Sequence, residues 1–336
     1  MRLDRLNHLP AQLLDIAPRE IRRVFPHPTL ITVEGRHREP LFLATVLHGN
    51  ETTSFYVLQD LARRYAHTPP PRSLMIFVGN VDAAEAGVRR LPGQHDFNRI
   101  WAGGDGPLFE LAQTVLQTAR DARPFASIDI HNNTGTNPHY GCVNSMRPAA
   151  LHLAALFSRI GVYYRNPLTT QSLAFTAFCP AVTIECGRPD DAAGVTQAIN
   201  LVDAVLHMDH LPERMPAPSD LTLYETVGRV VVDEGRSFSF GDNGTDLALS
   251  TELGRMNFSE MPAGAIWGHS LCSRSPLRVY DENDVDLTDQ FFSRHDATIQ
   301  LTRAATPAMI TPDLEVIRQD CLCYLMQPLP YPEIVQ

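Results

Sequence analysis

The sequence predicts an α/β domain followed by a smaller β-rich domain. In the first two thirds of the chain, short apolar runs alternate with stretches of helical spacing; a proline-rich stretch then precedes short runs punctuated by glycine. A length of 336 residues suits about two domains. With 44% hydrophobic and 20% charged residues, the chain can bury a sizeable core and is not disordered by composition.

The first domain shows short apolar runs that are typical of buried strands, because they are rich in β-branched and aromatic residues. We expect strands over 30–33, 41–47, 74–78, 125–130 and 181–184. Helical spacing of apolar residues predicts helices over 51–65, 108–119, 149–160 and 192–208. Alternation of this kind favours a sheet covered by helices.

A change of composition marks the predicted domain boundary. Residues 211–219 contain three prolines, which suit an exposed linker better than the interior of a helix or strand. We place the boundary there, giving domains 1–212 and 213–336. The second domain is predicted to be β-rich, because β-type runs such as 227–232 alternate with glycines and no convincing long helix follows.

Charge and composition exclude several classes of function. Acidic residues outnumber basic ones 38 to 28, so the excess positive charge of a nucleic-acid-binding protein is missing. The sequence contains no lysine, which excludes a Schiff-base lysine, a pyridoxal-phosphate lysine and a P-loop lysine. A small anionic substrate would have to be held by local arginines against a net charge of −10.

Cysteine usage and hydropathy favour a cytoplasmic protein. The six cysteines show no paired framework and are expected to be reduced. No apolar run approaches the roughly 18 residues that a membrane span needs, and the first residues lack the apolar region of a signal peptide. We expect neither a membrane nor a nucleic acid as a partner, and a homo-oligomer is left open.

One pair of candidate metal ligands follows an apolar strand directly. His48 and Glu51 lie three residues apart where a strand gives way to a helix, the place where open α/β sheets bind ligands. Imidazole and carboxylate at this spacing can reach one ion, and both suit Zn²⁺. The pair alone is not specific, because His210 and Glu213 in the proposed linker have the same spacing.

Two further strand ends carry residues that complete such a site. Asp129 and His131 share one face of a strand, so Asp129 could orient a ligating imidazole. Glu185 ends another buried strand, where a carboxylate is costly unless it is paired or functional. A structural histidine and a salt-bridged glutamate are the alternatives. Together with Glu51, the two histidines would make a catalytic zinc site, with Glu185 as general base.

The ordered set of motifs over residues from about 40 to 190 resembles the succinylglutamate desuccinylase/aspartoacylase family of the zinc carboxypeptidase (M14) superfamily. The motifs that carry the resemblance are His48-Gly49-Asn50-Glu51, Gly79-Asn80, Ala86-Gly87-Val88-Arg89-Arg90, Asp96-Phe97-Asn98-Arg99, Asp129-Ile130-His131-Asn132 and Ile184-Glu185-Cys186-Gly187. The resemblance implies a three-layer α/β/α zinc-peptidase domain with a mixed sheet, and a β-rich domain that covers the active site.

The resemblance also implies roles for individual residues. One Zn²⁺ per chain would be held by His48, Glu51 and His131, and Glu185 would be the general base. Asn98 and Arg99 would hold a substrate carboxylate. Arg90, or else Arg89, would polarise the scissile carbonyl, since a guanidinium stabilises a developing oxyanion. Tyr331, or else Tyr324, would be the tyrosine that the second domain supplies in the family.

The sequence departs from aspartoacylases at one position. These enzymes carry an arginine about ten residues before the catalytic glutamate, and residues 172–179 contain none, which argues against N-acetylaspartate as substrate. We therefore predict a zinc-dependent amide hydrolase of a small N-acyl amino acid or a related carboxylate-bearing amide. The alternatives are a metallocarboxypeptidase that removes C-terminal residues from peptides and, in a different class, a non-catalytic binding module.

Overall fold

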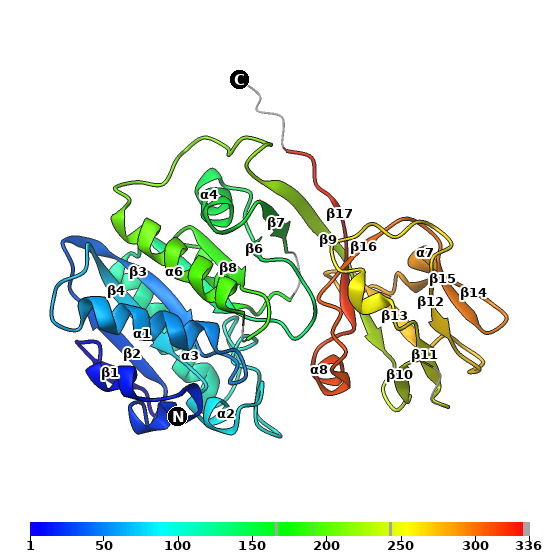
Figure 1. The fold of residues 1–336 in the computed structure, drawn as a ribbon, viewed down its shortest axis with the longest axis horizontal. Helices are drawn as coiled ribbons and strands as arrows, with labels where there is room; N and C mark the ends of the chain where they lie inside the picture. The colour runs from blue at the N-terminus through cyan, green and yellow to red at the C-terminus, as the bar shows by residue number, and fades with distance from the viewer. Residues whose placement is uncertain (165–166, 190, 242–243, 332–336) are drawn as a thin grey trace. The chain divides into compact units, whose positions relative to one another are not determined.

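The computed structural model describes residues 1–164, 167–189, 191–241 and 244–331, which form two compact units (Figure 1). The first unit comprises residues 1–132 and 139–222, and the second comprises residues 133–138 and the chain from 223 onward. Residues 213–222 lie with the first unit, whose side chains bind them. The His152 Nε2 atom lies 2.7 Å from the Arg214 carbonyl, and Arg159 donates to the Ser219 carbonyl at 2.5 Å.

The first unit is built on a mixed sheet. In spatial order its strands are β1 (Asp4–Leu6), β2 (Thr29–Val33), β4 (Arg72–Val78), β3 (His37–Thr45), β5 (Ala126–His131), β8 (Ala181–Glu185), β6 (Tyr140–Val143) and β7 (Ile160–Tyr163). The central strands β4, β3, β5 and β8 are parallel, whereas β2 and β6 run antiparallel to their neighbours in this group. Every residue of β4, β5 and β8 is buried, as expected of strands covered on both faces.

Helices cover both faces of this sheet (Figure 1). On one face α1 (Thr53–Tyr65), α4 (Pro148–Phe157) and α6 (Ala192–His207) pack together. On the other, α3 (Pro107–Ala122) and α5 (Gln171–Thr176), which carries Phe175, form a core with strand residues that include Phe42 and Phe77. The predicted three-layer α/β/α fold with a mixed sheet is confirmed. Among the described residues, no helix has the length and apolar character needed to cross a bilayer.

Short elements complete the first unit. They are the 3₁₀ helices η1 (Ala11–Asp15) and η2 (Pro18–Arg23) and the helix α2 (Val81–Ala86). The Asn80 side chain caps α2 by accepting a hydrogen bond from the Ala83 amide, and Gly87 ends this helix at φ +69°. The segment that follows α2 leads to Arg89 and Arg90.

The second unit contains two groups of strands. In one, β9 (Thr222–Val232) pairs with β13 (Leu277–Tyr280) and with β17 (Cys323–Pro328), which pairs with β16 (Thr306–Ala308). The other is a sheet in the order β10 (Phe238–Phe240), β11 (Leu247–Leu249), β12 (Ile266–His269), β15 (Thr298–Leu301) and β14 (Phe292–His295). Its described helices are short: η3 (Leu253–Arg255), α7 (Thr288–Phe291) and α8 (Leu314–Gln319). The expected β-rich character is confirmed.

Residues 133–138 are bound within the second unit although they interrupt the first in sequence. The Asn257 side chain donates to the Thr136 carbonyl at 3.1 Å, and Thr134 donates to the Thr311 hydroxyl at 2.6 Å. Gly135 lies so close to Ile310 that an added Cβ would sit 2.0 Å from its carbonyl oxygen. Residues 133–138, within the connection between β5 and β6, therefore pack as part of the second unit.

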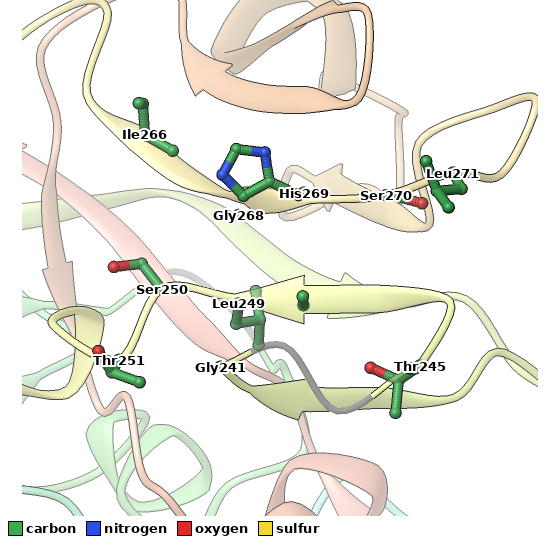
Figure 2. A pocket seen from close by; sticks show the side chains of 12 residues that line it. Gly241, Thr245, Leu249, Ser250, Thr251, Ile266, Gly268, His269, Ser270 and Leu271 are labelled. Carbon is green, nitrogen blue, oxygen red and sulfur yellow. The ribbon is translucent and has the colours of Figure 1, made fainter.

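A pocket of about 550 Å³ lies beside β11 and β12 (Figure 2). Ser250, Thr251 and His269 contribute polar side chains to it. Ile266 and Leu271 also line it, and they are 52% and 91% exposed. None of the residues that line this pocket belongs to the motifs of the first unit.

Candidate metal centre and active site

Three neighbouring parallel strands bring the predicted site residues to one edge of the sheet. His48 and Glu51 follow β3, His131 is the last residue of β5 and Glu185 is the last residue of β8. Because β3, β5 and β8 are parallel, their carboxyl ends lie together. His131 and Glu185 are also paired in register, so their side chains leave the sheet on the same face.

His48, Glu51 and His131 form a buried cluster that could hold a metal ion. The Nδ1 atoms of His48 and His131 lie 2.7 and 2.8 Å from the two carboxylate oxygens of Glu51. One ligand atom from each residue lies within 4.8 Å of the others, and all three side chains are buried. Two imidazoles and one carboxylate are the protein ligands of many catalytic zinc sites. These residues therefore fit a zinc ion with one position left for another ligand.

The electrostatics of the cluster suit a cation. Burial alone would raise the pKa of Glu51, but the two imidazoles hold it below its usual value. Burial opposes protonation of His131, yet Asp129 and Glu51 raise its pKa well above the usual range. The pKa of His48 is raised as well, because Glu51 and Asp96 outweigh burial and Arg89. The carboxylates thus make this buried place favourable for positive charge.

Each imidazole is also held by a second carboxylate. The Nε2 atom of His131 lies 2.9 Å from Asp129, which is the pairing that strand alternation predicts. The Nε2 atom of His48 lies 3.0 Å from Asp96. A carboxylate that accepts from Nε2–H leaves Nδ1 free to bind a metal and fixes the ring's orientation. Both imidazoles therefore present Nδ1 towards Glu51.

Asp96 connects the cluster to an arginine. The Oδ2 atom of Asp96 accepts a hydrogen bond from Arg89 at 3.0 Å, and its Oδ1 atom accepts from the backbone amide of Asn98 at 2.7 Å. Despite burial, His48 and Arg89 hold the pKa of Asp96 well below its usual value. Sequence reasoning assigned no role to Asp96; its only signal was its place in the 96–99 motif.

Arg89 reaches the cluster. Its Nη1 atom lies 3.6 Å from Glu51, and 14% of its side chain is exposed. The Arg90 guanidinium instead donates to the Gln94 carbonyl at 2.8 Å, within the turn that follows. The sequence predicts Arg90, or else Arg89, as the residue that polarises the scissile carbonyl; the structure places the Arg89 guanidinium beside Glu51, and the role itself stays a prediction.

Asp96→Asn is expected to weaken zinc binding by about 10- to 100-fold, the usual cost of losing a group that orients a metal ligand. The variant side chain keeps its shape but loses the charge that holds both His48 and Arg89. Competition with a chromophoric chelator would measure the affinity. Asp82→Asn is the matched control, because Asp82 pairs with Arg22 on the surface. Equal zinc affinity in Asp96→Asn and the wild type would contradict this role.

Asn98 and Arg99, the predicted carboxylate-binding pair, lie next to the cluster. The Asn98 Nδ2 atom is 3.1 Å from His131 Nε2 and 3.3 Å from Asp129, and its Oδ1 accepts from the Gln171 amide at 2.8 Å. Arg99 donates to the Asn98 carbonyl. The structure thus brings both residues to the predicted site, and their binding of a substrate carboxylate stays a prediction.

The predicted tyrosine belongs to the second unit. Tyr331 follows β17, whereas Tyr324 lies on β17, is buried and pairs in register with Arg229. A role for Tyr331 in substrate binding stays a prediction.

The segment that lacks the aspartoacylase arginine is neutral and tightly bonded. It includes α5, where the Ser172 hydroxyl donates to Asn144 at 2.8 Å and accepts from Thr183 at 2.9 Å. Thr183 in turn lies 3.5 Å from Asp129. Hydroxyl and amide groups at this place supply no positive charge for a second substrate carboxylate.

Gly49 allows the turn after β3 to approach α2. An added Cβ would lie 2.0 Å from the Ala83 carbonyl carbon, which no side chain tolerates. The Gly49 amide also donates to the Arg89 carbonyl at 3.1 Å. Because Gly49 has no side chain, the segment that carries Arg89 can pack directly against the turn that carries His48 and Glu51.

One family of known proteins matches part of this chain. Residues 39–193 match the model of the succinylglutamate desuccinylase/aspartoacylase catalytic domain. This segment contains every predicted site residue except Tyr331. No curated protein sequence matches the chain significantly.

Solved structures share the fold at low sequence identity. The succinylglutamate desuccinylase from Chromobacterium violaceum is 17% identical, with a TM-score of 0.58 over 89% of this chain and 87% of that one. The ectoine utilization protein EutE (DoeB) from Ruegeria pomeroyi is 16% identical, with a TM-score of 0.56 over 90% and 88%. Murine aminoacylase 3 is 13% identical, with a TM-score of 0.56 over 88% and 96%. Residues 39–193 are therefore similar to the succinylglutamate desuccinylase/aspartoacylase catalytic domain, and the chain shares the fold of these solved structures.

Proposed function

We propose that this protein is a zinc-dependent hydrolase that removes the acyl group from a small N-acyl amino acid or a related carboxylate-bearing amide. The observation that carries the proposal is the buried His48–Glu51–His131 cluster beside Glu185, within a segment that matches a deacylase catalytic domain. Two structural neighbours, a succinylglutamate desuccinylase and an aminoacylase, are named for the deacylation of amino acids and support it.

The cluster residues would hold one Zn²⁺ per chain. A zinc ion bound there would act as a Lewis acid towards the scissile carbonyl and lower the pKa of a water molecule. The orientation of both imidazoles by Asp96 and Asp129 supports this assignment, since ligating histidines are commonly held by carboxylates.

Glu185 would move the proton that amide hydrolysis requires. Its carboxylate accepts a proton from the attacking water and then delivers it to the amine nitrogen as the C–N bond breaks. Arg89, whose guanidinium lies 3.6 Å from Glu51, would donate to the developing oxyanion. Arg99 together with Asn98 would hold the substrate carboxylate, because the planar donor fork of arginine matches a carboxylate.

The hydroxyl and amide groups beside α5 bear on the class of amino acid. Because Ser172, Thr183 and Asn144 supply hydrogen-bonding groups and no cation, a substrate side chain that is apolar or neutral fits better than the second carboxylate of aspartate. A cytoplasmic location and the absence of nucleic-acid and membrane partners stay predictions from the sequence.

A metal analysis and a substrate panel test the proposal. We expect about one zinc per purified chain, hydrolysis of N-acetyl and N-succinyl amino acids, and loss of activity with a chelator that added zinc reverses. Faster turnover of peptides of five or more residues would favour the metallocarboxypeptidase alternative. A protein without zinc, or one whose activity survives the chelator, would overturn the proposal, and a binding module would then account for an inactive protein.

A further inference from the structure

We propose that Asn132 is a positioning residue that fixes the three strand-end segments of the site relative to one another. It rests on the proposed function, because the segments concerned carry the proposed zinc ligands and the proposed general base. Asn132 is the last residue of the Asp129–Asn132 motif and directly follows His131. It is 4% exposed, so its bonds are made in a nearly water-free environment.

The Asn132 side chain uses both ends of its amide. Its Oδ1 accepts a hydrogen bond from the Thr53 amide at 3.0 Å, and its Nδ2 donates to the Thr53 hydroxyl at 2.9 Å. The same Nδ2 lies 3.0 and 3.2 Å from the carbonyl oxygens of Gly187 and Arg188. One side chain therefore joins the start of α1 to the loop that follows β8.

Each of these partners lies close in sequence to a site residue. Thr53 is two residues after Glu51, and Gly187 is two residues after Glu185. The backbone amide of Asn132 itself donates to the Glu51 carboxylate at 3.1 Å. A second bond, from the Thr52 hydroxyl to the Pro189 carbonyl at 2.5 Å, joins the same two segments. The contacts of Asn132 thus link Glu51, His131 and Glu185 through short lengths of backbone.

Asn132 also replaces a missing helix cap. Thr52 is the N-cap residue of α1, and its side chain makes no capping bond. The Thr53 amide is one of the first amides of this helix, which have no partner within the helix. Asn132, in the loop after β5, accepts from that amide across the sheet edge. The first amide of the helix that follows the proposed zinc ligands His48 and Glu51 is therefore satisfied by a different segment of the chain. This is a connection that a local cap could not supply.

The test compares Asn132→Ala with Gln59→Ala as the matched control. Gln59 is a side-chain amide on the same helix that donates to two carbonyls, those of Leu13 and Ile16, away from the site. Zinc affinity, kcat and KM at saturating zinc, and hydrogen exchange of the Thr53 amide would be measured in the full chain.

We expect Asn132→Ala to bind zinc about 10- to 100-fold more weakly, to lower kcat with little change in KM, and to lose protection of the Thr53 amide. Gln59→Ala should lower thermal stability without these three changes. Wild-type zinc affinity and kcat in Asn132→Ala, or the same losses in Gln59→Ala, would overturn the inference.

A milder variant keeps the inference testable if Asn132→Ala does not fold. Thr53→Val removes the hydroxyl that accepts from Asn132 Nδ2. It leaves intact the hydrogen bond from the Thr53 backbone amide to Asn132 Oδ1. It should shift zinc affinity and kcat in the same direction by less, and unchanged values would overturn the inference. Should the wild type hydrolyse no amide while Asn132→Ala still loses zinc affinity and Thr53 protection, the proposed function would fail and the positioning role would stand.

Discussion

Glu185→Gln is expected to keep its zinc and to lose about 10²- to 10⁴-fold in turnover. Glutamine has nearly the same shape as glutamate but cannot accept the proton of the attacking water. Glu185 is 6% exposed and ends β8 in register with His131, so the substitution changes the chemistry at the cluster without removing a ligand. Zinc content and kcat on the best N-acyl amino acid would be measured together.

Glu110→Gln serves as the control for this prediction, because Glu110 lies in the exposed first turn of α3. It should match the wild type in both measurements. Nearly full activity of Glu185→Gln would remove the general-base assignment, and loss of zinc would instead make Glu185 a ligand.

His131→Ala is expected to lose the metal and, with it, all measurable activity. The substitution removes one of three ligands and also leaves Glu51 and Asp129 as buried carboxylates without their shared imidazole. Removing one partner from a buried charged pair costs about 3–5 kcal/mol, so the melting temperature should fall as well. Metal analysis after gel filtration and a thermal melt would measure both effects.

For comparison, His152→Ala removes a histidine of the same unit whose Nε2 atom lies 2.7 Å from the Arg214 carbonyl. It should retain zinc and activity. A His131→Ala protein that still carried one zinc per chain would show that the ion binds elsewhere.

The central strands of the first unit could be predicted because burial on both faces leaves a continuous apolar run. β4 and β8 are such runs, and their ends were placed within a few residues. β6 and β7 have four residues each and α5 has six, so none carries enough periodicity to be recognised. The short elements matter nonetheless, since Gln171 at the start of α5 holds Asn98.

The metal cluster could be predicted because its members follow a rule about sheets: the ends of parallel strands meet at one edge. The partners of those residues obey no such local rule. Asp96 is 48 residues from His48 in sequence, and Asn132 is 79 residues from Thr53. The sequence also could not predict which of Arg89 and Arg90 reaches Asp96. In a turn without periodicity, tertiary contacts alone decide the directions of two consecutive side chains.

The second unit takes six residues, 133–138, from between two strands of the first. A polypeptide ending at residue 222 would keep that loop but lose Asn257, Ile310 and Thr311, against which it is held. The orphaned loop begins two residues after His131. Truncation would therefore loosen the backbone next to His131, a proposed zinc ligand, so a shortened catalytic fragment is a poor substitute for the whole polypeptide in any study of this chemistry.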